Sequence, residues 1–231
     1  MSMPLGAVVT IYLVATYFVC GIPFGKIVAR RNHVDISHVG SGNIGTTNVG
    51  RTVGAPAAGL TLALDAGKGL LCTALARPVL ATLCLGGDAS ALANGAELGW
   101  VVALVYLGCI VGHVFSPYLR GHGGKGIAVG FGGALGFGWE VALGLLVVWV
   151  VAVAPTRIVS AGSCAAAVSL PIWSFVFYRP SWAYLAIMCA ISAIVLWAHR
   201  SNLRKLFRGE EKRFSFHHDG EPPAASGRDG R

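Results

Sequence analysis

The chain alternates between long apolar stretches and short polar segments. Seven apolar stretches are present, and most approach the ~20 residues that a helix needs to cross a bilayer. They cover residues 5–25, 69–86, 97–117, 126–139, 140–156, 158–177 and 181–198. The fourth stretch is the shortest, and Glu140 is an approximate boundary between it and the fifth. The pattern predicts an all-α, polytopic integral membrane protein with seven transmembrane helices.

Composition agrees with this pattern. Of the 231 residues, 55% are hydrophobic and 12% are charged, a balance that suits lipid surroundings better than water. The first stretch lacks a basic leading segment and a small-residue cleavage pattern, so we expect it to be a retained span and no removed signal peptide. We predict one transmembrane domain over residues 1–208. Residues 209–231, rich in Glu, Arg, Gly and Pro, are predicted to be a disordered cytoplasmic tail without chemistry.

Basic residues predict the orientation, because lysine and arginine concentrate in cytoplasmic loops. They collect in alternate loops and after the last stretch, so the N-terminus is predicted outside and the C-terminus in the cytoplasm. The residues on this side are Lys26, Arg30, Arg31, Arg51, Lys68, Arg120, Lys125, Arg157 and eight more after Trp197.

The formal net charge of +8 does not indicate nucleic-acid binding, because the basic residues are spread over several loops without interleaved exposed aromatics. Anionic headgroups and phosphorylated substrates explain the charge better. The six cysteines lie in or at the ends of apolar runs and form no Cys-x-x-Cys pair. We interpret them as small buried hydrophobic residues and expect no metal site and no disulfide framework.

The most polar segment is Gly40–Arg51, which reads Gly-Ser-Gly-Asn-Ile-Gly-Thr-Thr-Asn-Val-Gly-Arg. Its glycine turns, hydroxyls, amides and arginine suit an anion, although the same residue types also favour simple turns and helix caps. Gly40, Gly42 and Gly45 match the Gly-x-Gly-x-x-Gly pattern of dinucleotide sites. The preceding residues form no buried strand and a membrane helix follows, so we reject that interpretation.

Three further polar groups stand beside predicted helices. Asp65 and Lys68 are three residues apart and suit either an ion pair or, for Lys68, a phosphate contact. Lys125 lies in Gly-Gly-Lys-Gly, which lacks the spacing of a P-loop but permits a phosphate to approach; a lysine reaching the membrane surface is the alternative. His199 and Asn202 share one helical face, a signal that is weak by itself.

Taken together, these segments resemble one enzyme family. The order Gly-Ser-Gly-Asn-Ile-Gly-x-Thr-Asn-Val-x-Arg, Asp-x-x-Lys-Gly, Gly-His-x-Phe, Gly-Gly-Lys-Gly, Thr-Arg-x-Val-Ser and His-Arg-x-Asn is similar to the bacterial acyl-phosphate:glycerol-3-phosphate acyltransferases, the PlsY family. The resemblance spans about residues 18–213. Departures such as Thr46, Gly50, Val129 and Ser201 leave the basic residues of the motifs intact.

The resemblance implies a seven-helix enzyme of the bacterial inner membrane with its active site on the cytoplasmic side. It implies transfer of a fatty acyl group from acyl phosphate to the 1-hydroxyl of glycerol 3-phosphate, which gives lysophosphatidic acid and inorganic phosphate without a metal or another cofactor. No histidine of the chain is followed five residues later by aspartate, so the His-x4-Asp signature of other acyltransferases is absent. Seven helices can enclose a site without a partner, and we expect a monomer.

The resemblance also implies residue roles. Lys125, His199 and Ser41 are predicted as the catalytic group, with Lys125 between the donor and acceptor phosphates. Arg51, His199 and Asn202 would hold glycerol 3-phosphate, and we favour Ser163 over Ser160 as a further acceptor contact. The predicted substrate-binding residues are Gly42, Asn43, Thr47, Asn48, Arg51, Lys68, Gly123, Gly124, Ser160, Ser163 and Asn202.

Two questions stay open at the level of the sequence. Either an oxygen of the donor phosphate or His199 could accept the proton of the attacking hydroxyl. The competing functional classes are an anion transporter and a non-catalytic lipid-binding protein. Transport is disfavoured because the basic residues lie on one side and no internal repeat is evident.

Overall fold

The computed structural model describes residues 2–213, and all regular elements in this part of the chain are helical. The predicted all-helical class is therefore confirmed. In chain order the elements are α1 (Leu5–Gly21), α2 (Phe24–Arg31), α3 (Thr46–Thr52), α4 (Ala55–Cys84), η1 (Ser90–Leu92), α5 (Gly99–Val114), η2 (Pro117–Leu119), α6 (Ile127–Phe137), α7 (Trp139–Thr156), α8 (Val159–Tyr178), α9 (Trp182–Ala198) and α10 (Arg200–Phe207).

Each predicted apolar stretch overlaps one helix, and these helices are α1, α4, α5, α6, α7, α8 and α9. Five segments are long and apolar enough to cross a membrane: α1 with α2, α4, α5 with η2, α7 and α8. A sixth follows if α9 and α10, which meet at a 66° bend, count as one span. Helix α6 has only 11 residues, about 16 Å of helix against a hydrocarbon core of about 30 Å. Five or six spans are thus supported, while seven spans and the orientation stay predictions.

The predicted start of the second membrane helix, at residue 69, was wrong. Helix α4 begins at Ala55 rather than at residue 69 and continues for 30 residues. The expectation failed because Asp65 and Lys68 interrupt the apolar run in the sequence. In the structure both side chains are buried and joined to each other, so the helix passes through them without interruption.

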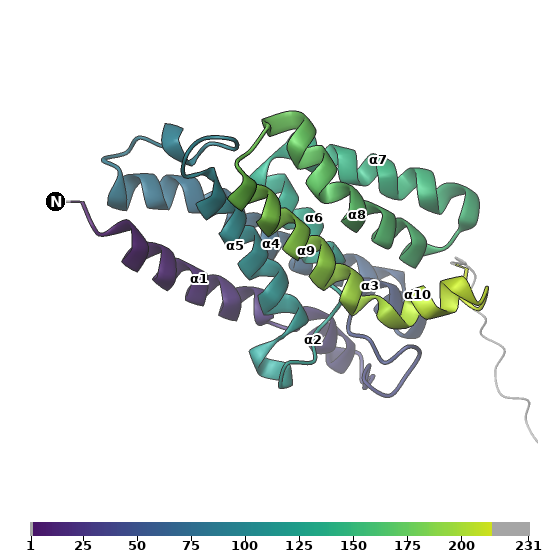
Figure 1. Cartoon of the computed structure of the whole chain (residues 1–231). Helices are drawn as coiled ribbons and strands as arrows, with labels where there is room; N and C mark the ends of the chain where they lie inside the picture. Colours follow the sequence, from purple (N-terminus) through teal and green to yellow (C-terminus); the bar gives the residue numbers. More distant parts are fainter. Residues whose placement is uncertain (1, 214–231) are drawn as a thin grey trace, which may run out of the picture.

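The helices pack mainly in pairs, with α4 against α6, α7 against α8 and α1 against α5 (Figure 1). Aromatic side chains fill the core where α5 and α6 meet α9. Phe137 of α6 packs against Tyr106 of α5 and Tyr184 of α9, with ring centroids 5.6 Å apart in both pairs. The Tyr106 hydroxyl donates to the Gly130 carbonyl at 2.8 Å, which satisfies its only donor inside the core.

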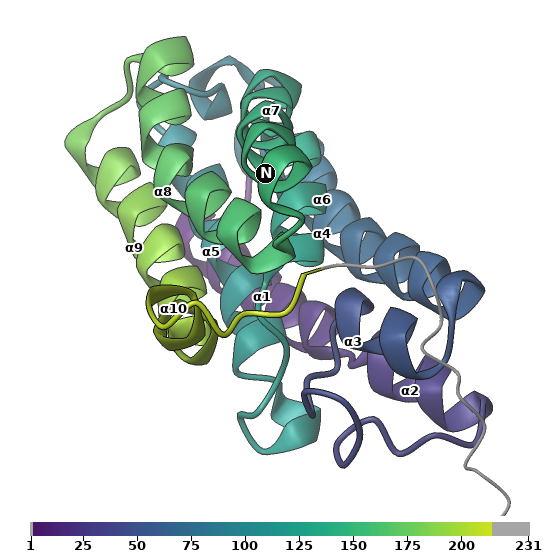
Figure 2. The same cartoon turned by 90° about the vertical axis from the view of Figure 1, so that its right-hand side faces the viewer.

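The two ends of the bundle differ. The N-terminus and the α4–α5 connection lie at one end, whereas α2, α3 and α10 lie at the other (Figure 1). Figure 2 looks onto this second end, where the last described residues run back from α10. The polar segments that the sequence singled out, from the first loop to His199 and Asn202, are therefore placed at one end of the molecule.

Candidate active site

The end of α5 positions the segment that carries Lys125. The Gly123 amide donates to the Val114 carbonyl at 2.9 Å, and the Gly124 amide donates to the His113 carbonyl at 3.2 Å. A Cβ atom on Gly124 would lie 2.2 Å from Nε2 of His113, so a side chain there would force the imidazole ring to move. Both glycine amides are used within the protein. Gly123 and Gly124 thus hold the segment against α5, and their amides are not free for the direct phosphate contact that the sequence predicted.

Lys125 is directed to α10. Its ammonium group donates a hydrogen bond to Oδ1 of Asn202, 77 residues further along the chain. Burial lowers the pKa of Lys125, the Glu211 carboxylate opposes this shift, and the positive charges of Lys205 and Arg51 add to it. Asn202 is therefore bonded to Lys125, and Arg51 is close enough for its charge to act on the ammonium; the predicted roles of both towards substrate stay predictions. Within residues 2–213, no carboxylate oxygen lies within 4.0 Å of the Lys125 ammonium.

A serine and a glutamate complete this group. The Ser160 hydroxyl donates to Oε1 of Glu211 at 3.0 Å, and Nδ2 of Asn202 donates to the same oxygen at 2.7 Å. Ser160 lies in the first turn of α8 and is 7% exposed. Ser163, which the sequence favoured, instead donates to the Val159 carbonyl of its own helix at 2.9 Å. The structure therefore joins Ser160 to the group around Lys125 by a hydrogen bond, whereas the hydrogen bond of Ser163 stays within α8.

Sequence reasoning missed Glu211. It lies in the segment that was predicted to be a disordered tail, of which residues 209–213 are described and 214–231 lie outside the described residues. The segment carries many charges, so no pattern in the sequence distinguishes Glu211 from its neighbour Glu210. The available signal was its position shortly after the His-Arg-x-Asn segment.

His199 lies at the bend between α9 and α10 and is 3% exposed. Its Nδ1 atom is 2.8 Å from the Val195 carbonyl, which can only accept, so Nδ1 carries the proton and Nε2 is the free acceptor of the neutral ring. Burial lowers the pKa of His199 to about 4, and the charge of Lys125 contributes in the same direction. The ring is therefore neutral at pH 7.

The first loop is built by its own asparagines. Asn48 is 3% exposed, accepts from the Ser41 amide at 2.9 Å and donates to the carbonyls of Val39 and Asn43. The Asn43 side chain accepts from the Gly45 amide at 2.8 Å. Both side chains, predicted as substrate contacts, are used to shape the loop. This arrangement leaves the hydroxyl of Ser41 exposed at the surface of the loop.

The remaining predicted residues of this region lie around the loop. Thr47 and Arg51 belong to α3, where Thr47 is partly buried and Arg51 is exposed. The Gly42 amide donates to the Val39 carbonyl at 3.1 Å, so it too is engaged. A pocket of about 360 Å³ separates the first loop from the Lys125 segment. It is lined by Lys26, Ser37, Gly42, Ile44, Tyr118, Leu119, Arg120, His122 and Gly123.

Lys68 has a different environment from Lys125. Its ammonium lies 2.7 Å from Oδ1 of Asp65 and donates to the Ile22 carbonyl at 2.7 Å, and its side chain is 3% exposed. These contacts bear out the ion pair that the sequence offered as the structural interpretation. They give no support to a phosphate contact by Lys68. His113 lies between this pair and the Lys125 segment, with Nδ1 3.8 Å from Asp65 and Nε2 against Gly124.

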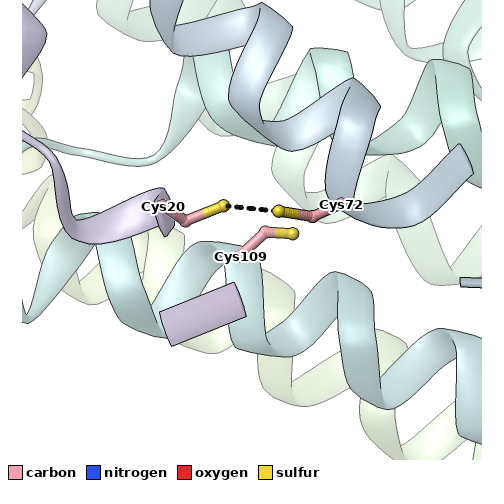
Figure 3. Close-up of side chains that lie close together, drawn as sticks. All are labelled: Cys20, Cys72 and Cys109. Atoms are coloured by element: carbon pink, nitrogen blue, oxygen red, sulfur yellow. Dashed lines mark hydrogen bonds between the residues drawn. The ribbon is translucent and has the colours of Figure 1, made fainter. Parts of the chain in front are cut away.

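One group of residues has the donor atoms for a soft metal ion. The sulfurs of Cys20, Cys72 and Cys109, from α1, α4 and α5, lie within 4.8 Å of one another (Figure 3). Those of Cys20 and Cys72 are 3.8 Å apart, against ~2.05 Å in a disulfide, so all three are free thiols. Cys20 also donates weakly to the Lys68 carbonyl. The thiols fill the seam between three helices and contact none of the residues around Lys125.

Comparisons with known proteins show the family of this chain. Residues 10–209 match the family model described as glycerol-3-phosphate acyltransferase. Relatives with that name include one from Gloeobacter violaceus, 37% identical over 91% of this chain and 94% of its own length, and one from Prochlorococcus marinus, 29% identical over 87% and 94%.

Two solved structures are similar over most of the chain. One is the glycerol 3-phosphate form of PlsY, an integral membrane glycerol 3-phosphate acyltransferase, with a TM-score of 0.78 and 29% identity over 90% of this chain and 96% of that one. The other is the lysophosphatidic acid form, with a TM-score of 0.77 and 28% identity over 91% and 97%. The family model, the relatives and the shared fold together show that this chain belongs to the PlsY family of integral membrane glycerol-3-phosphate acyltransferases.

Proposed function

We propose that this protein transfers a fatty acyl group from acyl phosphate to the 1-hydroxyl of glycerol 3-phosphate, as the first acylation of phospholipid synthesis. The products are lysophosphatidic acid and inorganic phosphate. Family membership supports the acceptor, because the relatives carry the name glycerol-3-phosphate acyltransferase. The two PlsY structures are described as forms with glycerol 3-phosphate and with lysophosphatidic acid, which are the proposed acceptor and product.

One observation carries the proposal for this chain: Lys125 is a partly buried cation whose bonded partner is a neutral amide. A cation that is removed from water without a bound carboxylate favours an anionic ligand strongly. Arg51 and Lys205 add positive charge nearby. Two phosphorylated reactants would neutralise this charge, and Lys125 would lie between their phosphates.

The polar neighbours of Lys125 suit the acceptor. Arg51 offers a planar fork that binds two phosphate oxygens at once. Asn202 and Ser160 offer an amide and a hydroxyl beside Lys125. Ser41, on the exposed surface of the first loop, offers a hydroxyl to the donor phosphate, across the pocket that Lys26 and Arg120 line.

Acyl phosphate is a mixed anhydride with a good leaving group, so the protein needs to supply positioning and stabilisation of charge. The 1-hydroxyl oxygen attacks the acyl carbon, a new ester bond forms, and the bond from the acyl carbon to the phosphate oxygen breaks. We assign the hydroxyl proton to an oxygen of the departing phosphate, which leaves as hydrogen phosphate. The scheme uses no metal and no other cofactor.

The environment of His199 favours this proton path. A histidine with a pKa of about 4 is a weak base at pH 7, because its protonated form is unstable in the site. Its Nε2 atom can nevertheless accept a hydrogen bond while Nδ1 is held by the Val195 carbonyl. We therefore assign His199 to orienting the acceptor hydroxyl rather than to removing its proton.

We place the reaction at the inner leaflet of the bacterial cell membrane, because α2, α3 and α10 lie at one end of the bundle (Figure 1), carry many of the lysines and arginines, and include Asn202, to which Lys125 is bonded. In this orientation the N-terminus lies outside and α10 lies in the cytoplasm. We propose that the monomer is the active unit, since Lys125, Asn202, Ser160 and Arg51 come together within one chain.

One assay tests the function. Purified protein receives glycerol 3-phosphate and a long-chain acyl phosphate, and released phosphate and lysophosphatidic acid are measured together. We expect both products in equal amounts, and no product when acyl-CoA replaces acyl phosphate. Equal activity with acyl-CoA would overturn the proposed donor. Transport of glycerol 3-phosphate without any ester product would favour an anion transporter instead, and binding without product would favour a non-catalytic binding protein.

A further inference from the structure

Glu211 is the residue around Lys125 to which neither the sequence motifs nor the family comparison assigns a role. A single oxygen, Oε1, accepts hydrogen bonds from both Ser160 and Asn202, at 3.0 and 2.7 Å. Through these bonds the segment after α10 is joined to the first turn of α8. Glu210, the preceding residue, is exposed and makes no side-chain hydrogen bond within residues 2–213.

The chain turns back after α10 in a defined way. Helix α10 ends at Phe207, and Gly209 adopts φ +70°, a left-handed conformation that glycine takes at helix ends. The Gly209 amide donates to the Leu206 carbonyl, and the Glu210 amide donates to the Lys205 carbonyl at 2.8 Å. After this reversal the chain runs back alongside α10. Glu211 therefore reaches Asn202, which lies nine residues earlier in the chain.

The chemistry of the three partners determines how the Asn202 amide is oriented. A lysine ammonium can only donate and a carboxylate can only accept, so Oδ1 must face Lys125 and Nδ2 must face Glu211. Lys125 and Glu211 therefore favour the same orientation of the amide. Glu211 anchors the Nδ2 end of Asn202, which holds Oδ1 against the Lys125 ammonium.

We propose that Glu211 is a positioning residue that acts through Asn202 and Ser160 to hold Lys125 in place for the two phosphates. This inference rests on the proposed function. The role requires an acceptor oxygen at the Oε1 position and does not require the negative charge. It predicts that glutamine, which keeps that oxygen, replaces glutamate better than alanine does.

The test compares Glu211→Ala and Glu211→Gln with Glu210→Ala as the matched control, by steady-state kinetics with glycerol 3-phosphate varied. Two hydrogen bonds to one carboxylate suggest that Glu211→Ala lowers kcat/KM at least about tenfold. We expect Glu211→Gln to stay within about threefold of the unaltered protein, because the oxygen is retained. Glu210→Ala should match the unaltered protein.

A double-mutant cycle separates positioning from a general effect on folding. If Glu211 acts through Asn202, Glu211→Ala should lower kcat/KM by no more than about twofold in an Asn202→Ala background. A full tenfold loss in that background, unchanged kinetics of Glu211→Ala, or tighter glycerol 3-phosphate binding by it would each overturn the inference. An unaltered protein that forms no ester would instead refute the proposed function, so the two failures are distinguishable.

Discussion

Two lysines of this protein look alike in the sequence and differ in the structure. Lys68 lies in Asp-Ala-Gly-Lys-Gly and Lys125 in Gly-Gly-Lys-Gly, and both were predicted to contact phosphate. Lys68 is paired with the buried Asp65 carboxylate and the Ile22 carbonyl. Lys125 is bonded to the neutral Asn202 amide. The Glu211 carboxylate acts on it from beyond Asn202, and Lys205 and Arg51 add positive charge.

The difference shows what separates a structural cation from a binding cation. A lysine with an internal carboxylate at 2.7 Å has little electrostatic reason to bind another anion. A lysine that is bonded to a neutral group and has further cations nearby attracts an anion. His113 links the two, because it lies between Asp65 and Gly124, so the Lys68 pair supports the segment from which Lys125 extends.

The largest expected effect is on stability, at Lys68. Lys68→Ala leaves the Asp65 carboxylate buried without a partner, which costs about 3–5 kcal/mol of unfolding free energy. Unfolding in mixed detergent and SDS micelles measures this loss. The matched control is the double variant Asp65→Leu with Lys68→Met, which removes both charges and should lose much less. A single variant as stable as the unaltered protein would show that the pair is not structural.

The next effect is on catalysis, at Lys125. Lys125→Ala removes the charge between the two phosphates, and kcat/KM should fall about 10²- to 10³-fold, as for other charge-stabilising groups in closed sites. The free energy of unfolding of this variant should remain close to that of the unaltered protein, because removing Lys125 leaves no buried carboxylate without an ion-pair partner. Near-normal turnover would remove Lys125 from the mechanism. Lys212→Ala, an exposed lysine near the end of the described chain, serves as the control.

His199 predicts a pH dependence. The unfolded chain takes up a proton on His199 below its ordinary pKa of 6.5, whereas the folded protein does so only near pH 4. The contribution of the neutral His199 ring to the free energy of unfolding is therefore complete above pH 6.5. It is lost as the pH drops to about 4, and the loss is at most about 3 kcal/mol. Thermal unfolding of the unaltered protein and of His199→Gln across this range measures the effect. An equal pH dependence in the two proteins would contradict the buried neutral ring.

The smallest expected effect distinguishes two serines on α8. Ser160→Ala removes a hydroxyl next to Asn202 and Glu211, so the KM for glycerol 3-phosphate should rise about tenfold. Ser163→Ala removes a bond to its own helix and should change KM by less than about twofold. Steady-state kinetics of the two variants decide between them. The reverse order would restore the assignment that the sequence favoured.

Much of the fold was predictable, because apolar stretches mark membrane helices directly. The start of α4 was not, since Asp65 and Lys68 look like the end of a span until their pairing is known. The length of α6 was not predictable either. Its sequence is apolar throughout, and the helix has 11 residues, shorter than the predicted stretch 126–139, so its role as a separate span stays a prediction.

The site was predictable as a set of residues and less so as a set of contacts. Lys125 and Asn202, 77 residues apart in the chain, are joined as the motifs implied, and Arg51 acts on Lys125 only through its charge. Asn43 and Asn48 satisfy backbone groups of their own loop, a use that residue type alone cannot distinguish from ligand binding. Glu211 depends on a chain reversal at Gly209 that leaves no pattern in the sequence.

The central claim is that Lys125, and not Lys68, is the cation that binds phosphate. Equilibrium binding of radiolabelled glycerol 3-phosphate to purified protein tests it in three forms: unaltered, Lys125→Met, and the double variant Asp65→Leu with Lys68→Met. The account predicts binding by the unaltered protein and by the double variant, and loss of binding in Lys125→Met. Retained binding in Lys125→Met together with loss in the folded double variant would contradict it.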